Sequence, residues 1–158
     1  MYEKILVPLD GSKMGEAALP YVEELVSQLL PKVKVEVTLF QVVPSIAHWV
    51  VGGEATAPVP YTEIEMEQIK KRAIEYLDKA AEGLRNRGAI VECKVGVGSP
   101  AEEIIKVTDE IKADVVAMST HGRSGLGQWA FGSVTAKVLR GGNIPVLMVR
   151  APRDTEKT

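Results

Sequence analysis

The sequence predicts an α/β domain with an open five-stranded parallel sheet and helices on both faces. Two observations support this prediction. Short, continuous apolar runs such as residues 4–9 (KILVPL) are typical of strands buried on both faces, and segments with apolar residues at helical spacing lie between them. The expected strands are residues 4–9, 33–43, 90–95, 114–118 and 144–149. Strands that alternate with helices indicate parallel βαβ units with right-handed crossovers.

The first helix and the segment after the second strand are the least regular parts of this pattern. Apolar residues between Ala18 and Leu29 define a helical face that stops at Pro31. Pro20 predicts either a late helix start or a kink, because proline fits only the first turn of a helix. Residues 44–60 contain several prolines and glycines, and we expect them to form a loop.

The other helices have recognisable ends. Thr62 and Glu65 are spaced as a capping box, and Gly88 suits the position just after the end of that helix. Residues 99–102 (SPAE) combine a capping serine, a proline at the first helical position and a capping-box glutamate, and open a helix expected to run to about residue 111. Residues 133–139 lie in the last expected helix.

Length and composition are those of one globular domain. The chain has 158 residues, which suits a single domain over residues 1–151 with a frayed tail at 152–158. A net charge of −2 gives no reason to expect nucleic acid or an anionic membrane as a partner. Cys93 is the only cysteine, so an intramolecular disulfide is excluded. No apolar run approaches the roughly 18 residues of a membrane span. We therefore expect a soluble, cytoplasmic protein.

Three segments that follow expected strands point to one crevice. Residues 8–12, 96–100 and 118–134 come after strand carboxyl ends, where open α/β sheets bind their ligands. Glycines in the last segment allow backbone N–H groups to surround an anion, and Gly132 lies where a helix begins. The hydroxyls of Ser133 and Thr135 are candidate phosphate donors. A mobile surface loop followed by an ordinary serine cap explains the same residues equally well.

Two familiar phosphate-binding motifs fail. Gly122 and Gly127 have the glycine spacing of a P-loop, but Gln128 and Trp129 stand where lysine and serine or threonine are required. Residues 125–130 (GLGQWA) match the dinucleotide fingerprint but begin too far beyond their strand, and only one strand follows. Neither a P-loop hydrolase nor a dinucleotide site is therefore expected.

A third pattern fits. Gly122, nine residues, then Gly132 and Ser133 resemble the second half of the nucleotide-binding motif of the universal stress protein family. That motif runs glycine, two residues, glycine, nine residues, glycine, then serine or threonine. The resemblance extends to residues 5–12 (ILVPLDGS), 98–100 (GSP), 119–125 (STHGRSG) and 144–149 (IPVLMV). Ser119 departs from the pattern because it occupies the position of the motif's first glycine, which affects ligand affinity and not the fold.

The resemblance implies a Rossmann-like domain, similar to the adenine nucleotide alpha hydrolases, that binds ATP, ADP or AMP with Mg²⁺ or Mn²⁺. It also implies a homodimer formed through the C-terminal edge strand. By position, Pro8 and Asp10 would line the pocket, with Asp10 contacting ribose or a divalent cation. Val42 and Met118 would contact adenine. The ribose and phosphates would lie against the remaining positions, which are Ser119, Gly122, Gly132, Ser133, Val134 and Thr135.

The residues alone give little reason to expect an enzyme. Taken alone, Asp10 is better explained as the cap of the first helix, and only the family resemblance favours a ligand role; His121 has no second catalytic group beside it. The sequence shows no metal-ligand cluster and no serine–histidine–aspartate order. We therefore favour a stress-response or signalling module that changes its protein contacts with its nucleotide. Two alternatives remain: a slow ATPase or nucleotidyl-transfer enzyme of the related nucleotide-hydrolase superfamily, and a nucleotide-free scaffold.

Overall fold

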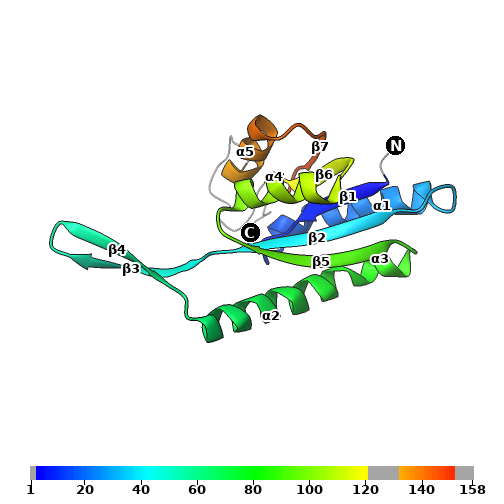
Figure 1. Cartoon of the computed structure of the whole chain (residues 1–158). Coiled ribbons are helices and arrows are strands. Elements are labelled where there is room, and N and C mark those ends of the chain that lie inside the picture. Colours follow the sequence, from blue (N-terminus) through cyan, green and yellow to red (C-terminus); the bar gives the residue numbers. More distant parts are fainter. Residues whose placement is uncertain (1–2, 121–131, 152–158) are drawn as a thin grey trace, which may run out of the picture.

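The computed structural model describes residues 3–120 and 132–151, and its centre is a five-stranded parallel sheet (Figure 1). The strands lie in the order β5-β2-β1-β6-β7, and each neighbouring pair is parallel. Their bounds are β1 Lys4–Pro8, β2 Glu36–Val43, β5 Ile90–Val97, β6 Val115–Ser119 and β7 Val146–Val149. The predicted fold class is confirmed, and the last strand lies at an edge of the sheet.

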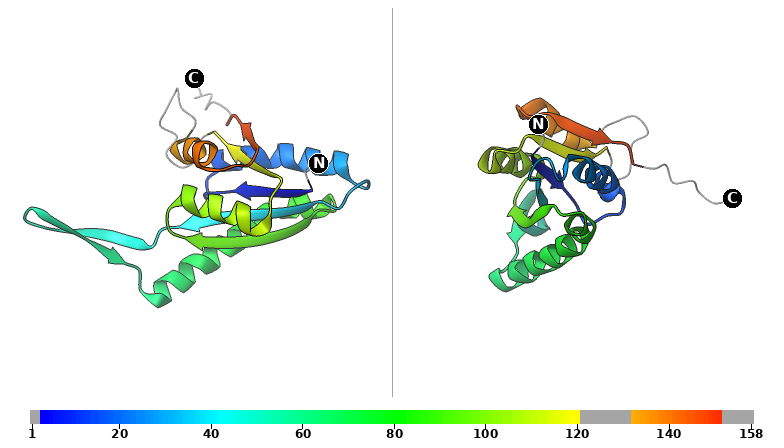
Figure 2. Two further views of the ribbon diagram at one scale, coloured as in Figure 1. Left: turned by 45° about the horizontal axis from the view of Figure 1, so that its top comes forward. Right: turned by 90° about the vertical axis from the view of Figure 1, so that its right-hand side faces the viewer.

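Helices cover both faces of this sheet (Figure 2). Besides the 3-10 helix η1 (Met14–Ala18), they are α1 Leu19–Leu29, α2 Glu63–Ala80, α3 Glu82–Asn86, α4 Pro100–Ile111 and α5 Ser133–Gly141. Successive strand residues enter opposite layers, as the pleat requires. Ile5 and Val7 pack with α1, α2 and α3, whereas Leu6 packs with α4 and α5. Helices on both faces explain why the central strands consist of continuous apolar runs.

The helix ends agree with the sequence except at α4. Thr62 and Glu65 form the predicted capping box, with N–H to side-chain distances of 3.2 and 3.3 Å. Pro20 lies in the first turn of α1, so the helix starts late, after η1. Ser99 precedes α4 but makes no capping hydrogen bond, so the predicted capping box with Glu102 is wrong. The helix nevertheless starts where predicted, because Pro100 presets the first helical φ.

Residues 44–60 are not the expected loop. They contain an antiparallel hairpin, β3 (Ile46–Gly52) and β4 (Ala55–Pro60), separate from the main sheet. Gly53 has a φ of 64° and supplies the left-handed residue of the turn. The alternation typical of a half-buried strand is missing because apolar residues occupy both faces of this ribbon, which extends away from the body (Figure 1).

Other boundaries shift for local reasons. Strand β7 begins at Val146 and not at Ile144, because Pro145 has no N–H for a sheet ladder. The helix opened by the capping box is broken near Ala81 into α2 and α3, and Gly88 follows with the expected positive φ of 95°. The predicted tail at 152–158 lies outside the described residues. Within those residues, no helix is long and apolar enough to cross a membrane.

Candidate functional site

A cavity of about 720 Å³ lies at the carboxyl ends of β1, β2 and β6. Every predicted site residue that the structure describes lines it, and the set consists of Pro8, Asp10, Val42, Met118, Ser119, Gly132, Ser133, Val134 and Thr135. Gly122, the remaining member, lies outside the described residues. The cavity is where an open α/β sheet is expected to hold a ligand, because the crossovers leave a crevice there.

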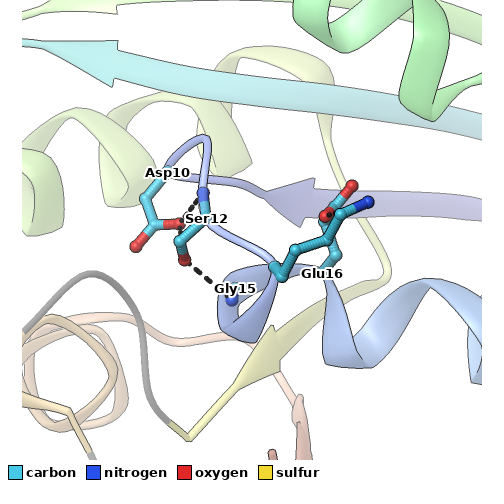
Figure 3. A network of polar contacts seen from close by, with 5 residues as sticks. Asp10, Ser12, Gly15 and Glu16 are labelled. Carbon is cyan, nitrogen blue, oxygen red and sulfur yellow. Dashed lines mark hydrogen bonds and ion pairs between the residues drawn. The ribbon is translucent and has the colours of Figure 1, made fainter. Parts of the chain in front are cut away.

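The turn after β1 fixes the carboxylate of Asp10. Its Oδ1 atom accepts hydrogen bonds from the Ser12 backbone N–H at 2.9 Å and from the Ser12 hydroxyl at 2.6 Å. The Ser12 hydroxyl oxygen in turn accepts the N–H of Gly15 at 3.0 Å. Figure 3 shows this chain of contacts joining the end of β1 to η1. Asp10 therefore organises the turn beside the cavity, and the alternative that it caps a helix directly is not observed.

Gly15 is part of this arrangement, and sequence reasoning missed it. Gly15 is buried and lines the cavity. A Cβ atom built on it would overlap Asp10 Oδ1 and would also lie 3.2 Å from Ser12 Oγ. Only a residue without a side chain lets the Asp10 carboxylate approach the backbone of η1. The spacing of Asp10, Ser12 and Gly15 is the signal that was available in the sequence.

The end of β6 is tied to its neighbours by two hydroxyl groups. Ser119, at the position of the family motif's first glycine, is 8% exposed and donates its hydroxyl proton to the Met14 carbonyl at 2.8 Å. Thr135 is 2% exposed and donates to the Ser119 carbonyl at 3.1 Å. A threonine hydroxyl has one proton, so that of Thr135 is already used within the protein. In this structure the Thr135 hydroxyl therefore donates within the protein, and its donation to a phosphate stays a prediction.

The first turn of α5 contributes backbone donors instead. Gly132 precedes the helix, makes no side-chain cap, and contacts the Thr120 carbonyl through its N–H. The helical hydrogen bonds begin at Ala136, whose N–H donates to the Gly132 carbonyl at 3.0 Å. The N–H groups of residues 133–135 therefore precede the helix's own hydrogen-bond ladder. Such an end attracts anions.

The opposite wall of the cavity comes from α2 and was not predicted. Its lining residues are Ile69, Arg72, Ala73 and Tyr76, and Tyr61 lines the cavity just before the helix begins. Helical periodicity identified Ile69, Ala73 and Tyr76 as an apolar face, but such a face looks the same whether it covers a core or a cavity. Among the lining residues that the structure describes, Asp10 and Arg72 are the charged ones.

The described lining residues include no histidine or cysteine, and the described parts of the chain hold no cluster of three metal-ligating side chains. A divalent cation at Asp10 would therefore need ligand oxygens and water to complete its shell. Mg²⁺ is commonly held in this way, by one or two carboxylates and the phosphates of its ligand.

The fold and the site define an α/β domain with a cavity at the carboxyl ends of its parallel strands. The chain belongs to the universal stress protein family, whose model matches residues 1–150. It is 30% identical to the universal stress protein of Methanothermobacter thermautotrophicus, with 95% of this chain and 97% of that protein covered.

Solved structures show the same fold. The structure of MJ0577 from Methanocaldococcus jannaschii is similar with a TM-score of 0.73 and 27% identity, covering 98% of this chain and 99% of that chain. The universal stress protein of Archaeoglobus fulgidus, solved in complex with dAMP, has a TM-score of 0.63 and 23% identity, covering 94% and 98% of the two chains. The latter likeness supports the fold, and its ligand is a property of that protein.

Proposed function

We propose that this protein binds an adenine nucleotide, with ATP as its principal ligand, and acts as a stress-response or signalling module. The observation that carries the proposal is one cavity that combines an apolar region near Val42 and Met118 with the first turn of α5. Its volume of about 720 Å³ is within the usual range for small-ligand sites. The adenine nucleotide held by the Archaeoglobus fulgidus relative supports the same ligand class.

The proposed roles follow the chemistry of the lining. Val42 and Met118 offer apolar surface to the base, and Pro8 closes the pocket beside them. Asp10 offers a carboxylate to the ribose hydroxyls or to Mg²⁺ or Mn²⁺ on the phosphates. Ser119 and Gly122 flank the ribose and phosphates. Gly132–Thr135 receive the phosphates through backbone N–H groups and the helix dipole.

We expect the protein to retain bound ATP and to hydrolyse it slowly or not at all. Phosphoryl transfer depends on positioning and charge stabilisation, but hydrolysis also needs a group that orients the attacking water. Asp10 is held by Ser12, and His121, the other candidate, has no partner in the sequence to orient it and lies outside the described residues. Slow hydrolysis or nucleotidyl transfer remains the alternative function.

A homodimer through β7 is the second part of the proposal. Val116 N–H donates to the Pro145 carbonyl at 3.0 Å and Thr120 N–H to the Val149 carbonyl at 2.9 Å, so odd-numbered residues of β7 face β6. Val146 and Met148 consequently turn their backbone groups away from the sheet, along its edge. Leu147 adds a 39% exposed apolar side chain. Pairing with the same strand of a second copy would cover this edge.

Calorimetric titration with ATP, with and without Mg²⁺, tests the binding proposal. Asp10→Asn keeps an acceptor for Ser12 but removes the charge, and we expect about tenfold weaker binding of Mg·ATP, a loss of about 1.4 kcal/mol. Asp114→Asn is the matched control, because Asp114 Oδ2 accepts the N–H of Lys4 at 2.8 Å at the opposite edge of the sheet. Equal affinities of the two variants would remove Asp10 from the site.

Single-turnover measurements with radiolabelled ATP test the expectation of slow hydrolysis. We expect turnover far below the roughly 1–100 s⁻¹ of kinases, unchanged in His121→Ala. Fast hydrolysis that disappears in His121→Ala would make the protein an ATPase. Failure of the wild-type protein to bind or copurify with any nucleotide would support the scaffold alternative.

A further inference from the structure

The hairpin formed by β3 and β4, hereafter the arm, stands in solvent with apolar residues on both faces. It projects from the body at the end of β2 (Figures 1 and 2). Trp49, Val50 and Val51 are 59%, 50% and 70% exposed. Glu54, in the turn, is the only charged residue between positions 46 and 60. A two-stranded ribbon is at best marginally stable alone, and three or more strands are needed for independent stability. The arm therefore has the composition of a segment that is covered by further strands.

The two outer edges of the arm differ. Strand β4 carries Pro58 and Pro60, which have no N–H and are tolerated in a ladder where the nitrogen points away from the partner strand. The outer edge of β4 thus lacks donors at alternate positions, which is a common protection against strand addition. Strand β3 (IAHWVVG) contains no proline. Only β3 presents an outer edge that no proline interrupts, and none of the described residues pairs with that outer edge.

The register identifies the groups on that open edge. Trp49 lies opposite Pro58, and Val51 lies opposite Thr56. Hydrogen-bonded and non-hydrogen-bonded pairs alternate along an antiparallel ladder. Since Pro58 occupies a non-hydrogen-bonded pair, Trp49 and Val51 also direct their N–H and C=O groups outward. One residue separates Trp49 from Val51. Trp49 of one copy can therefore form a hydrogen-bonded pair with Val51 of an antiparallel copy, and Val51 can do the same with Trp49 of that copy.

We propose that β3 of the arm pairs antiparallel with β3 of a second copy of this chain, about a two-fold axis at Val50. The result is a four-stranded sheet with β4 of each copy on the outside. An antiparallel pair of identical edges is self-complementary, so one contact satisfies both chains. The prolines of β4 then block both outer edges, so no further strand adds to this four-stranded sheet.

The axis at Val50 is the register that best matches the side chains. It places Trp49 of each copy directly opposite Val51 of the other, on the same face as Pro58. Aromatic and β-branched residues form favourable cross-strand pairs. An axis at Val51 would instead set Trp49 opposite Gly53, at the turn. The single charged residues, Glu54, lie in turns at opposite ends of the paired strands and do not repel each other closely.

Two proline variants test the pairing edge by sedimentation at micromolar concentration. Val51→Pro removes an outward N–H from β3, whereas Thr56→Pro makes the same change at the facing position of β4. In a Val146→Pro background, which weakens the β7 contact, we expect Val51→Pro to have half the mass of Thr56→Pro. Equal masses for these two variants would overturn the proposal. The comparison does not depend on nucleotide binding, because both variants retain the cavity residues, and both carry the same change in β7.

Cysteine variants test the register without altering the backbone. In a Cys93→Ser background, Val50→Cys places two thiols at the axis, while Ala57→Cys places its thiol on the neighbouring strand of the same face. Mild oxidation followed by a non-reducing gel should show a covalent dimer for Val50→Cys and little for Ala57→Cys. Similar yields from the two variants, whether high or low, would contradict an axis at Val50.

Discussion

Replacing Gly15 by alanine tests the connection between the backbone of η1 and the Asp10 carboxylate. The added Cβ overlaps Asp10 Oδ1 and lies 3.2 Å from Ser12 Oγ, so the carboxylate has to turn away. That movement disturbs the contacts of Asp10 Oδ1 with Ser12 at 2.9 and 2.6 Å and the N–H bond of Gly15 to Ser12 at 3.0 Å. One alanine therefore perturbs a complete local network.

The expected magnitude follows from two opposing effects. A hydrogen bond to a charged group contributes about 1.5–3 kcal/mol, but Asp10 is partly exposed and water replaces part of what is lost. Alanine also lowers the entropy of the unfolded chain, which offsets about 0.4–1 kcal/mol. We expect a net loss of about 1–2 kcal/mol in unfolding free energy, and a fall in Tm of roughly 2–4 °C for each kcal/mol.

Thermal unfolding followed by circular dichroism measures the stability, and calorimetry measures ATP affinity. We expect about tenfold weaker binding for Gly15→Ala, because the displaced carboxylate no longer faces its ligand as before. Gly52→Ala is the control, since a Cβ at Gly52 meets nothing within 4 Å. A Gly15→Ala protein with the Tm and affinity of the control would refute the argument that Gly15 positions Asp10.

Three further outcomes are expected. Gly132 has φ −47° and ψ 147°, which valine also adopts, so Gly132→Val adds bulk at the start of α5 without straining the backbone. Calorimetry should show at least about tenfold weaker ATP binding in a folded protein. An undiminished affinity would show that the phosphates do not approach Gly132. Val146→Pro removes an outward N–H from β7. In a Val51→Pro background, which lacks the proposed arm contact, light scattering should show dissociation of the β7 dimer; an unchanged mass would place that contact elsewhere. Burial, aided by the Asp78 carboxylate and opposed by Arg85, raises the pKa of the Cys93 thiol, so less thiolate is present at neutral pH. Iodoacetamide should therefore alkylate Cys93 more slowly in the native than in the denatured protein, with the gap narrowing as pH rises; equal rates would contradict a raised pKa.

The strands and most helix ends were predictable because their signals lie within a few residues. The buried run before Asp10 identifies β1, and the Thr62–Glu65 pair identifies the start of α2, whatever surrounds them. Serine at position 99 is the counterexample. Its neighbour Pro100 starts α4 without the capping bond that the serine suggested.

The sequence also identified the lining of the carboxyl edge of the sheet. Parallel strands place their carboxyl ends together, so residues following β1, β2 and β6 had to meet. The motif spacing added Gly132 and Ser133, and the structure places both in the cavity wall. What each residue does there was less predictable, because a hydroxyl has one proton and its recipient depends on geometry. The Thr135 proton goes to the Ser119 carbonyl.

Local patterns in the chain were thus enough to predict the α/β class, the sheet edge that holds the cavity and nine of the residues that line it. The folded structure was needed to show that α2 forms the opposite wall, that Gly15 must lack a side chain beside Asp10, and that residues 46–60 form an arm with one blocked and one open edge. These features depend on contacts between segments far apart or on which way a backbone group faces. Hydrophobic periodicity records whether a residue avoids water but not what it meets, and that difference sets the limit of the prediction.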